Sequence, residues 1–315
     1  MKPFTLICTL AMASLFPLLS KPAAGQPLAG RWDLTITTPS ETYPSWVDMQ
    51  LTDGVPKVRV QGKVSSVHPA TAVKLEGTAP FSQISFTTSE WFGKPTIVTW
   101  YLTVADGSLL SGTQKRADGV VGQIAGVPAP MLKRPAPTDW TKPEPLFNGK
   151  NLDGWVADDP AINHWAVIDG DLVNEKPGAN LQSTRKVQDF KLHIEFNCPD
   201  EGNSGIYLRG RYEVQVAYQK ENDAIHGMGA VYGFLAPEQV IAPKPGTWET
   251  FDITLVGRHV TIVRDGVTTV NHREIPGITG GALDSAEAEP APIFLQGDHT
   301  GGMKYRNITI EVPKQ

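Results

Sequence analysis

Cysteine is nearly absent from this sequence, which has 2 in 315 residues. Cys8 lies in an apolar N-terminal segment, so Cys198 is the one cysteine that follows that segment. An intrachain disulfide and a cysteine-rich metal site are therefore excluded for the rest of the chain. No helix N-terminus or nearby histidine is evident to lower the pKa of Cys198, so we expect a small strand-end residue and not a nucleophile.

Positive charge is also scarce. The chain has 28 Lys and Arg against 33 Asp and Glu, which gives a formal net charge of -5. Because no basic field is present to attract phosphates, nucleic acid is not expected as a partner. A neutral small molecule fits this composition better.

Long apolar runs are missing after the first 25 residues. The one apolar run, Phe4 to Leu19, follows Lys2, contains Pro17 and is followed by Ala23-Ala24-Gly25. This order is typical of a secretory signal peptide, and the run is shorter than the ~20 residues needed to span a bilayer. We therefore expect residues 1–25 to be removed, the protein to be exported to the periplasm or the extracellular space, and no membrane insertion afterwards.

Helical periodicity is lacking as well, and 30 glycines and 26 prolines accompany short alternating runs. This pattern predicts an all-β protein. In residues 26–127 we expect a small β-barrel-like domain, because period-two runs recur every 8 to 12 residues. The expected strands are Arg31 to Thr37, Val47 to Thr52, Lys57 to Val60, Ala72 to Leu75, Gln83 to Thr87, Ile97 to Val104 and Leu109 to Thr113. Gly30-Arg31-Trp32 resembles the Gly-x-Trp start of lipocalin-like barrels.

The next segment, residues 128–144, is expected to be a stiff linker, because the stretch from Pro128 to Pro145 contains six prolines, both end residues included. Residues 145–315 are again predicted to form strands, and Arg264-Asp265-Gly266-Val267 is a hairpin signal. About ten antiparallel strands in this length favour a two-sheet jelly-roll sandwich. The expected strands are Trp165 to Ile168, Phe190 to Asn197, Gly205 to Leu208, Tyr212 to Ala217, Thr250 to Val256, His259 to Arg264, Thr268 to Asn271, Ile293 to Gln296 and Tyr305 to Glu311.

Polar side chains alternate with apolar ones along several of these strands. Successive strand residues point to opposite faces, so a polar set at period two marks a solvated or ligand-binding face. Such a face suits a pyranose, whose hydroxyls need paired donors and acceptors, although an ordinary solvated face has the same pattern. The outward set is Glu195, Tyr207, Arg209, Glu213, Gln215, Gln296 and Asp298, and the inward set includes Ile194, Ile206, Leu208, Val214, Val216 and Leu295.

Several motifs of the C-terminal half occur together and in order. They are Pro145 to Trp155 (PLFNGKNLDGW), Phe190 to Phe196 (FKLHIEF), Gly202 to Gly210 (GNSGIYLRG), Tyr212 to Val216 (YEVQV), Gly229 to Gly233 (GAVYG), Lys244 to Trp248 (KPGTW), Pro292 to His299 (PIFLQGDH) and Tyr305 to Ile308 (YRNI). This set resembles the 3-keto-disaccharide hydrolase domain, which is similar in fold to concanavalin A-like lectins and glucanases. The sequence departs from that pattern at Asn197, Ala217 and Glu249.

The resemblance implies cleavage of glycosides that carry a ketone at C3. Such a ketone acidifies the C2 proton, so a base can remove it, the C1 aglycone leaves by β-elimination, and water adds back. His299 is the first candidate for proton transfer, because its unperturbed pKa lies near neutrality. Glu213 and Glu195 are candidate acids, bases or sugar ligands.

Further residues are candidates for binding the substrate: Tyr207, Arg209, Gln215, Tyr232, Lys244, Gln296 and Asp298. Arg209 and Lys244 could stabilise the enolate or serve as structural ion-pair partners. Whether a divalent metal polarises the ketone stays open. Asp298, His299, Glu213 and His226 could supply ligands, but their spacing matches no known metal motif. Two alternatives also stay open: an ordinary glycoside hydrolase with Glu195 and Glu213 as its two carboxylates, and a non-catalytic carbohydrate-binding module.

Overall fold

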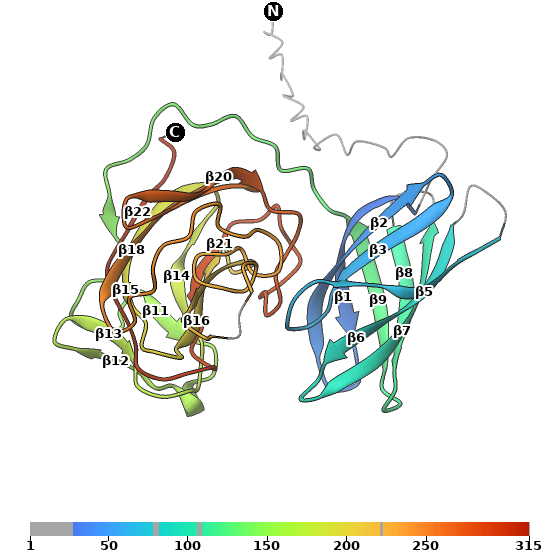
Figure 1. Ribbon diagram of the computed structural model, residues 1–315, viewed down its shortest axis with the longest axis horizontal. Helices are drawn as coiled ribbons and strands as arrows, with labels where there is room; N and C mark the ends of the chain where they lie inside the picture. Colours follow the sequence, from blue (N-terminus) through green and yellow to red (C-terminus); the bar gives the residue numbers. More distant parts are fainter. Residues whose placement is uncertain (1–27, 78–81, 106–108, 221–222, 315) are drawn as a thin grey trace, which may run out of the picture.

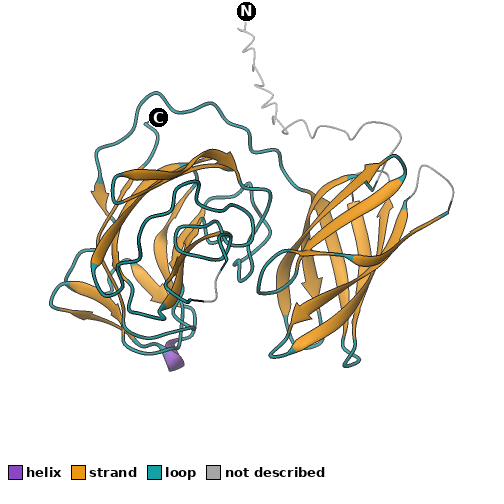
Figure 2. Ribbon diagram, in the orientation of Figure 1, coloured by secondary structure: helices purple, strands orange, loops and turns teal. Residues whose placement is uncertain are grey.

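The computed structural model describes residues 28–77, 82–105, 109–220 and 223–314. The expected signal segment, residues 1–25, lies outside this part of the chain. As predicted, the protein is nearly all β, and its described residues contain a single short 3-10 turn, η1 (Pro160–Ile162). Figure 2 shows two separate groups of strands joined by a long loop. No helix in the described residues is long and apolar enough to cross a membrane.

The first group is an antiparallel sheet of nine strands in the order β4-β3-β2-β1-β9-β8-β7-β6-β5 (Figure 1). Its buried side chains form one core around Trp32, Phe86 and Trp100. The strands are β1 (Gly30–Thr37), β2 (Thr42–Thr52), β3 (Val55–Gln61), β4 (His68–Pro69), β5 (Thr71–Glu76), β6 (Gln83–Trp91), β7 (Pro95–Ala105), β8 (Leu109–Arg116) and β9 (Val121–Pro128).

This sheet curls but does not close into a barrel, because β4 and β5 remain its edges. β4 has two residues, and β5 begins at a register shift between Thr71 and Lys74 where Ala72 takes a φ of 50°. A non-glycine residue in the left-handed region interrupts the regular strand, so β5 approaches β3 without forming a ladder with it. The β-barrel-like domain predicted for residues 26–127 is thus a curled sheet that stays open between β4 and β5.

The second group is a sandwich of two antiparallel sheets, in agreement with the predicted jelly-roll class. One sheet has the order β12-β13-β22-β15-β18-β19-β20, with β10 paired to β22, and the other has the order β11-β14-β21-β16-β17. Figure 1 shows the five-stranded sheet on the side of the sandwich that faces the first group. The strands are β10 (Glu144–Pro145), β11 (Trp155–Ala157), β12 (Trp165–Ile168), β13 (Asp171–Asn174), β14 (Leu181–Val187), β15 (Phe190–Asn197), β16 (Asn203–Leu208), β17 (Tyr212–Ala217), β18 (Trp248–Val256), β19 (His259–Arg264), β20 (Val267–Glu274), β21 (Ala291–Leu295) and β22 (Met303–Glu311).

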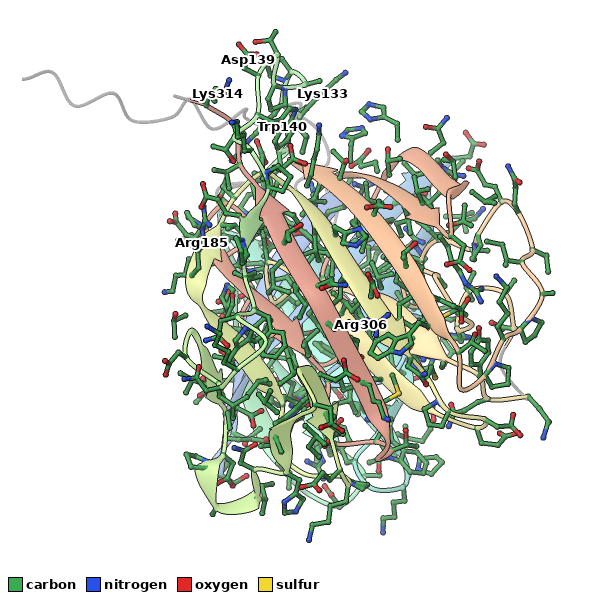
Figure 3. The ribbon with its side chains drawn as sticks, turned by 90° about the vertical axis from the view of Figure 1, so that its left-hand side faces the viewer. Lys133, Asp139, Trp140, Arg185, Arg306 and Lys314 are labelled. Carbon is green, nitrogen blue, oxygen red and sulfur yellow. The ribbon has the colours of Figure 1, made fainter. Side chains whose placement is uncertain are left out.

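Between the groups, residues 129–143 cross over the sandwich and reach its far side (Figure 1). Trp140 anchors this segment, since it bridges to Pro313 and lies under the Lys191 ammonium, 4.9 Å from the ring centre. Figure 3 shows Trp140 beside Lys314, above the eight-stranded sheet. Prolines keep the segment extended, and the Trp140 contacts fix its path.

The sandwich core contains Cys198, which is fully buried. Burial, the largest effect, raises the pKa of its thiol to about 12. A thiol with so high a pKa is not a thiolate near neutral pH, so Cys198 is a packing residue.

An aromatic side chain of the first sheet belongs to the core of the sandwich. Trp46, on β2, is fully buried there and meets Phe234 edge to face at 5.6 Å. The absence of a side chain at Gly277 makes room for it, because a Cβ there would lie 2.3 Å from the indole nitrogen. The two groups of strands are therefore locked together by a buried apolar contact.

Two buried carboxyl groups also meet at this junction. Asp33 on β1 contacts Glu287, which accepts a hydrogen bond from the Tyr212 hydroxyl at 2.6 Å and pairs with Arg258 at 3.1 Å. Burial, followed by the charge and hydrogen bond of Glu287, raises the pKa of Asp33 far above 3.8, against the opposing charges of Arg258 and Arg211. Asp33 therefore retains its proton across the neutral range.

Replacing Asp33 with asparagine is expected to make thermal stability less dependent on pH. A group whose pKa is raised by folding binds a proton that the unfolded chain has lost, so its contribution to stability falls as the pH rises above about 4. The melting temperature of the unmodified protein should therefore fall between pH 5 and 9, by roughly 2–4 °C for each kcal/mol lost from the free energy of unfolding. Differential scanning calorimetry of Asp33→Asn should give a smaller loss over that interval. Parallel losses in both proteins would show that Asp33 holds no proton.

Candidate functional site

A cavity of about 420 Å³ lies between the five-stranded sheet and the first group of strands. Its volume is within the range of small-molecule sites. The lining residues from the sandwich are Asn203, Tyr207, Glu213, Gln215, Tyr232, Gly280, Gly281, Gln296, Asp298 and His299, and those from the first group are Val64, Ser65 and Trp91. The cavity thus combines seven of the ten site residues predicted from the sequence.

Strand alternation builds the floor of this cavity. Tyr207 on β16 lies directly opposite Glu213 on β17, and Gly205 lies opposite Gln215. Their neighbours Ile206, Leu208, Val214 and Val216 point into the sandwich core, as the period-two pattern predicted. Glycine is needed at 205, because a Cβ there would lie 2.2 Å from Oε1 of Glu213. The gap above Gly205 is therefore the space that the Glu213 carboxyl occupies.

Glu213 is the most perturbed carboxyl of the cavity. Burial raises its pKa to about 8, and the charge of Asp298 adds to the rise while Tyr207 and His299 oppose it. The Tyr207 hydroxyl donates to the carbonyl of Gly280 at 2.8 Å and also contacts the Glu213 carboxyl. The Tyr207 hydroxyl has a single proton, which it donates to the Gly280 carbonyl. Its oxygen can therefore accept a hydrogen bond from the protonated carboxyl of Glu213. Glu213 is thus mostly a neutral acid at pH 7.

His299 forms the second titratable element, at the end of the segment after β21. Its Nδ1 lies 2.6 Å from Oδ1 of Asp298. That hydrogen bond raises the pKa of His299, helped by the charges of Asp298 and Glu213 and opposed by burial. Because Asp298 occupies Nδ1, Nε2 is the atom at which this imidazole can exchange a proton with a ligand.

Two amide oxygens of the floor lack partners. Oε1 of Gln215 and Oε1 of Gln296 are buried, and neither accepts a hydrogen bond within the described part of the chain. The amide nitrogen of Gln215 donates to Oδ1 of Asn203 at 3.1 Å, which fixes the orientation of its side chain. Buried acceptors without partners cost free energy, and hydroxyl groups of a ligand would satisfy them.

Tyr232 completes the polar floor. Its backbone N–H donates to the Glu213 carbonyl at 3.0 Å, and its ring meets His226 edge to face at 4.9 Å. Burial and then the charge of Glu213 raise the pKa of its hydroxyl. Tyr232 therefore offers a neutral hydroxyl donor and an aromatic ring to the cavity.

The structure places three of the predicted site residues elsewhere. Glu195 is on β15 in the other sheet, where Arg306 and Asn307 contact it at 2.7 and 2.6 Å. Burial raises its pKa, but these two hydrogen bonds outweigh that effect and lower it. Figure 3 shows Arg306 on the face that points away from the first group of strands. Glu195 and Glu213 are on opposite outer faces, so they cannot flank one glycosidic bond.

The two basic candidates also lie away from the cavity. Arg209 is fully buried at the turn after β16 and donates to the Gly257 carbonyl at 2.7 Å and the Tyr212 hydroxyl at 3.2 Å. Lys244 pairs with Asp265 at 2.8 Å. Both are engaged in structural contacts, and neither lines the cavity that holds Glu213 and His299.

Period-two reasoning could have found one more residue. Asn203 is two positions before Gly205 on β16, in phase with Tyr207, and it lines the cavity. Val64, Ser65 and Trp91 gave no such signal, because their position depends on how the two groups dock. Among the described residues, no set of three or more His, Cys, Asp or Glu side chains is placed to hold a metal ion.

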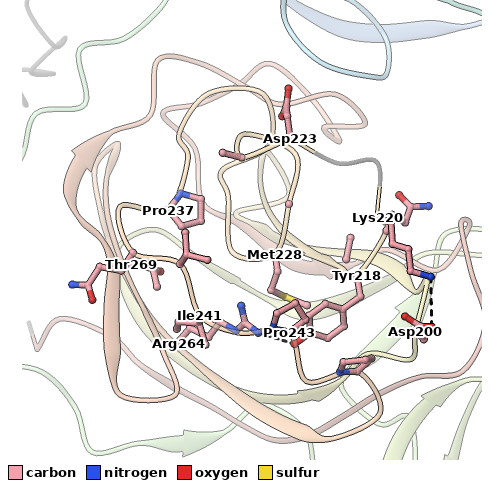
Figure 4. A pocket seen from close by; sticks show the side chains of 17 residues that line it. Asp200, Tyr218, Lys220, Asp223, Met228, Pro237, Ile241, Pro243, Arg264 and Thr269 are labelled. Carbon is pink, nitrogen blue, oxygen red and sulfur yellow. Dashed lines mark hydrogen bonds and ion pairs between the residues drawn. The ribbon is translucent and has the colours of Figure 1, made fainter.

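A second cavity, of about 460 Å³, lies beside β17 (Figure 4). Its charged side chains are paired within the protein. Arg264, for example, donates hydrogen bonds to the Tyr218 hydroxyl at 2.7 Å and to the Glu249 carboxylate at 2.9 Å. None of its lining residues is among those with a buried, unpartnered side-chain atom. The Glu213 cavity, which has two such atoms, is therefore the better candidate for a ligand site.

Comparison with known proteins agrees with this geometry. Residues 142–311 match the family model of the 3-keto-alpha-glucoside-1,2-lyase-like domain. The sandwich and its polar cavity thus define a carbohydrate-active, glycosidase-like class of protein. More narrowly, the chain belongs to the 3-keto-alpha-glucoside-1,2-lyase-like domain family.

Two similar solved structures each cover a little over half of the chain. A "putative glycosyl hydrolase" from Parabacteroides distasonis ATCC 8503 is 29% identical, covers 56% of this chain and 92% of its own, and has a TM-score of 0.47. A second protein of that description and organism is 18% identical, covers 54% of this chain and 92% of its own, and has a TM-score of 0.46. No curated protein matches the chain.

Proposed function

We propose that this protein cleaves glycosides whose sugar ring carries a ketone at C3. The observation that carries the proposal is the pairing, in one polar cavity, of a carboxyl group with a raised pKa and an imidazole oriented by a carboxylate. Membership of the 3-keto-alpha-glucoside-1,2-lyase-like domain family supports the choice of substrate.

The first half of the proposed reaction is an elimination. Nε2 of neutral His299 takes the proton from C2, which the adjacent ketone has made acidic. The electron pair forms a C1=C2 double bond conjugated with the ketone, and the bond from C1 to the leaving oxygen breaks. Protonated Glu213 donates its proton to that oxygen, so the aglycone departs as a neutral alcohol.

The second half restores the sugar. Water adds its oxygen to C1, and C2 takes back a proton, so the sum of the two halves is hydrolysis. The unpartnered oxygens of Gln215 and Gln296 would accept hydrogen bonds from ring hydroxyls and hold the sugar over Glu213. Tyr207 and Tyr232 contribute hydroxyl groups to the same surface.

The decisive experiment compares a 3-keto-glucoside with its unoxidised parent at equal concentration. We expect the keto substrate to be cleaved at least about 100-fold faster, because only its C2 proton is acidic enough to be removed. In deuterium oxide, the product should carry deuterium at C2 above the level of an enzyme-free control, as measured by mass spectrometry. Equal turnover of the parent would reject this route and favour Glu213 and Asp298 as the two carboxylates of an ordinary glycosidase.

We propose in addition that the protein acts outside the cytoplasm. The support for this is the signal-like pattern of residues 1–25.

A further inference from the structure

One wall of the cavity comes from outside the 3-keto-alpha-glucoside-1,2-lyase-like domain. Val64 and Ser65, in the loop after β3, and Trp91, the last residue of β6, line it together with the floor of the sandwich. All three precede residue 142, where the family match begins. The first group of strands therefore shapes the mouth of the site.

The loop that carries Val64 and Ser65 is fixed against the floor. The N–H of Gly281 donates to the carbonyl of Lys63 at 3.1 Å, and a Cβ at Gly280 would lie 2.2 Å from the carbonyl oxygen of Ser65. Ser65 takes a φ of 69°, and its carbonyl accepts a hydrogen bond from Gln61 at 2.9 Å. These contacts anchor the loop, with its strained residue Ser65, against the floor of the cavity.

Trp91 lies beside the β6–β7 hairpin turn and exposes its ring. It pairs with Pro95 across the β6–β7 hairpin, and the guanidinium of Arg116 stacks on the adjacent Phe92 at 3.8 Å. Alternation directs Phe86, Thr88 and Glu90 into the interior, and Trp91 therefore faces outward with 49% of its surface exposed. An indole in this position, at the rim of a polar cavity, presents a flat apolar face to a ligand.

We propose that Trp91 forms a subsite for the leaving-group half of the glycoside. The proposal rests on the proposed function for the identity of the substrate. The polar groups that would act on the oxidised ring are buried in the floor, so the rest of the substrate must extend toward the mouth, where Trp91 lies. A pyranose ring or an aryl group has the flat apolar face that stacks on an indole, whereas a methyl group does not. The N-terminal strands thus set the selectivity for the aglycone.

The test compares three 3-keto-glucosides, with glucosyl, 4-nitrophenyl and methyl leaving groups, in Trp91→Ala. For the first two, kcat/KM should fall about tenfold through a higher KM, which is the scale of an aromatic contact. For the methyl glycoside it should change by less than about twofold. Trp91→Phe should retain most of the activity on all three. Equal losses on the methyl and the larger substrates would overturn the subsite.

A binding measurement separates this proposal from the proposed function. Calorimetric titration with unoxidised 4-nitrophenyl glucoside and methyl glucoside needs no turnover. Trp91→Ala should weaken binding of the aryl glucoside about tenfold and leave the methyl glucoside unchanged, even if no keto substrate is cleaved. Unchanged aryl binding, or no measurable aryl binding by the unmodified protein, would refute the subsite. An unchanged melting temperature of the variant would exclude misfolding as the cause.

Discussion

Replacing Glu213 with glutamine is expected to lower kcat on a 3-keto-glucoside by about 10²-fold or more, the usual scale for loss of a general acid. Glutamine has the shape of the protonated carboxyl group but cannot transfer a proton. Glu213 acts in its protonated form and has a pKa of about 8, so activity of the unmodified protein should fall as the pH rises through 8. The variant should lose this alkaline decline, which a pH profile of kcat/KM would show, because that ratio reports the titration of the free enzyme.

Glu195→Gln is the matched control for this experiment. It removes a carboxyl group of the same kind from the opposite outer face, where Arg306 and Asn307 hold it. We expect near-normal turnover, and a large loss would contradict the placement of the site. The melting temperature of Glu213→Gln should not fall at pH 7, because the native side chain is already mostly neutral there. Normal turnover of Glu213→Gln would exclude Glu213 as the acid.

Much of this site follows from a single regularity of the sequence. Tyr207, Glu213 and Gln215 were predicted on one face because apolar residues alternate with them, and the register of β16 and β17 places them together. The buried set Ile206, Leu208, Val214 and Val216 confirms that alternation. Period-two reasoning succeeds here because both strands are regular over their whole length.

The same alternation wrongly predicted that Arg209 lies on the outward face, and the reason is local. Arg209 takes a φ of 51° in the turn that follows β16, so the strand alternation has already ended at this residue. Its guanidinium turns into the protein and caps the Gly257 carbonyl. A side chain at a strand end cannot be assigned a face from the spacing of the strand alone.

Glu195 shows a different limit. Its outward direction was predicted correctly, since Ile194 and Phe196 are in the core. The pattern of a strand, however, does not specify which of two sheets contains it, and β15 belongs to the eight-stranded sheet. Trp91 shows the limit of any strand pattern, because its contact with the cavity depends on how the two groups of strands dock through Trp46.

Replacing His299 with alanine should lower kcat by about 10²-fold or more as well, if its imidazole removes the C2 proton. A base acts when it is deprotonated, and the Asp298 hydrogen bond raises the pKa of His299 above 6.5. Activity of the unmodified protein should therefore rise with pH through that raised value and then fall near pH 8, as Glu213 ionises. His299→Ala should lose the acidic part of this bell-shaped profile and keep the alkaline part.

The matched control is His193→Ala, since His193 forms the same kind of pair with Asp252, at 2.7 Å, on the far sheet. That variant should retain both its turnover and the bell-shaped profile. Glu213→Gln and His299→Ala thus remove opposite sides of one curve, which two unrelated structural defects would not do. A profile of His299→Ala that keeps its acidic side would assign the proton transfer at C2 to another group, and Asp298 would be the next candidate because it shares the cavity with Glu213.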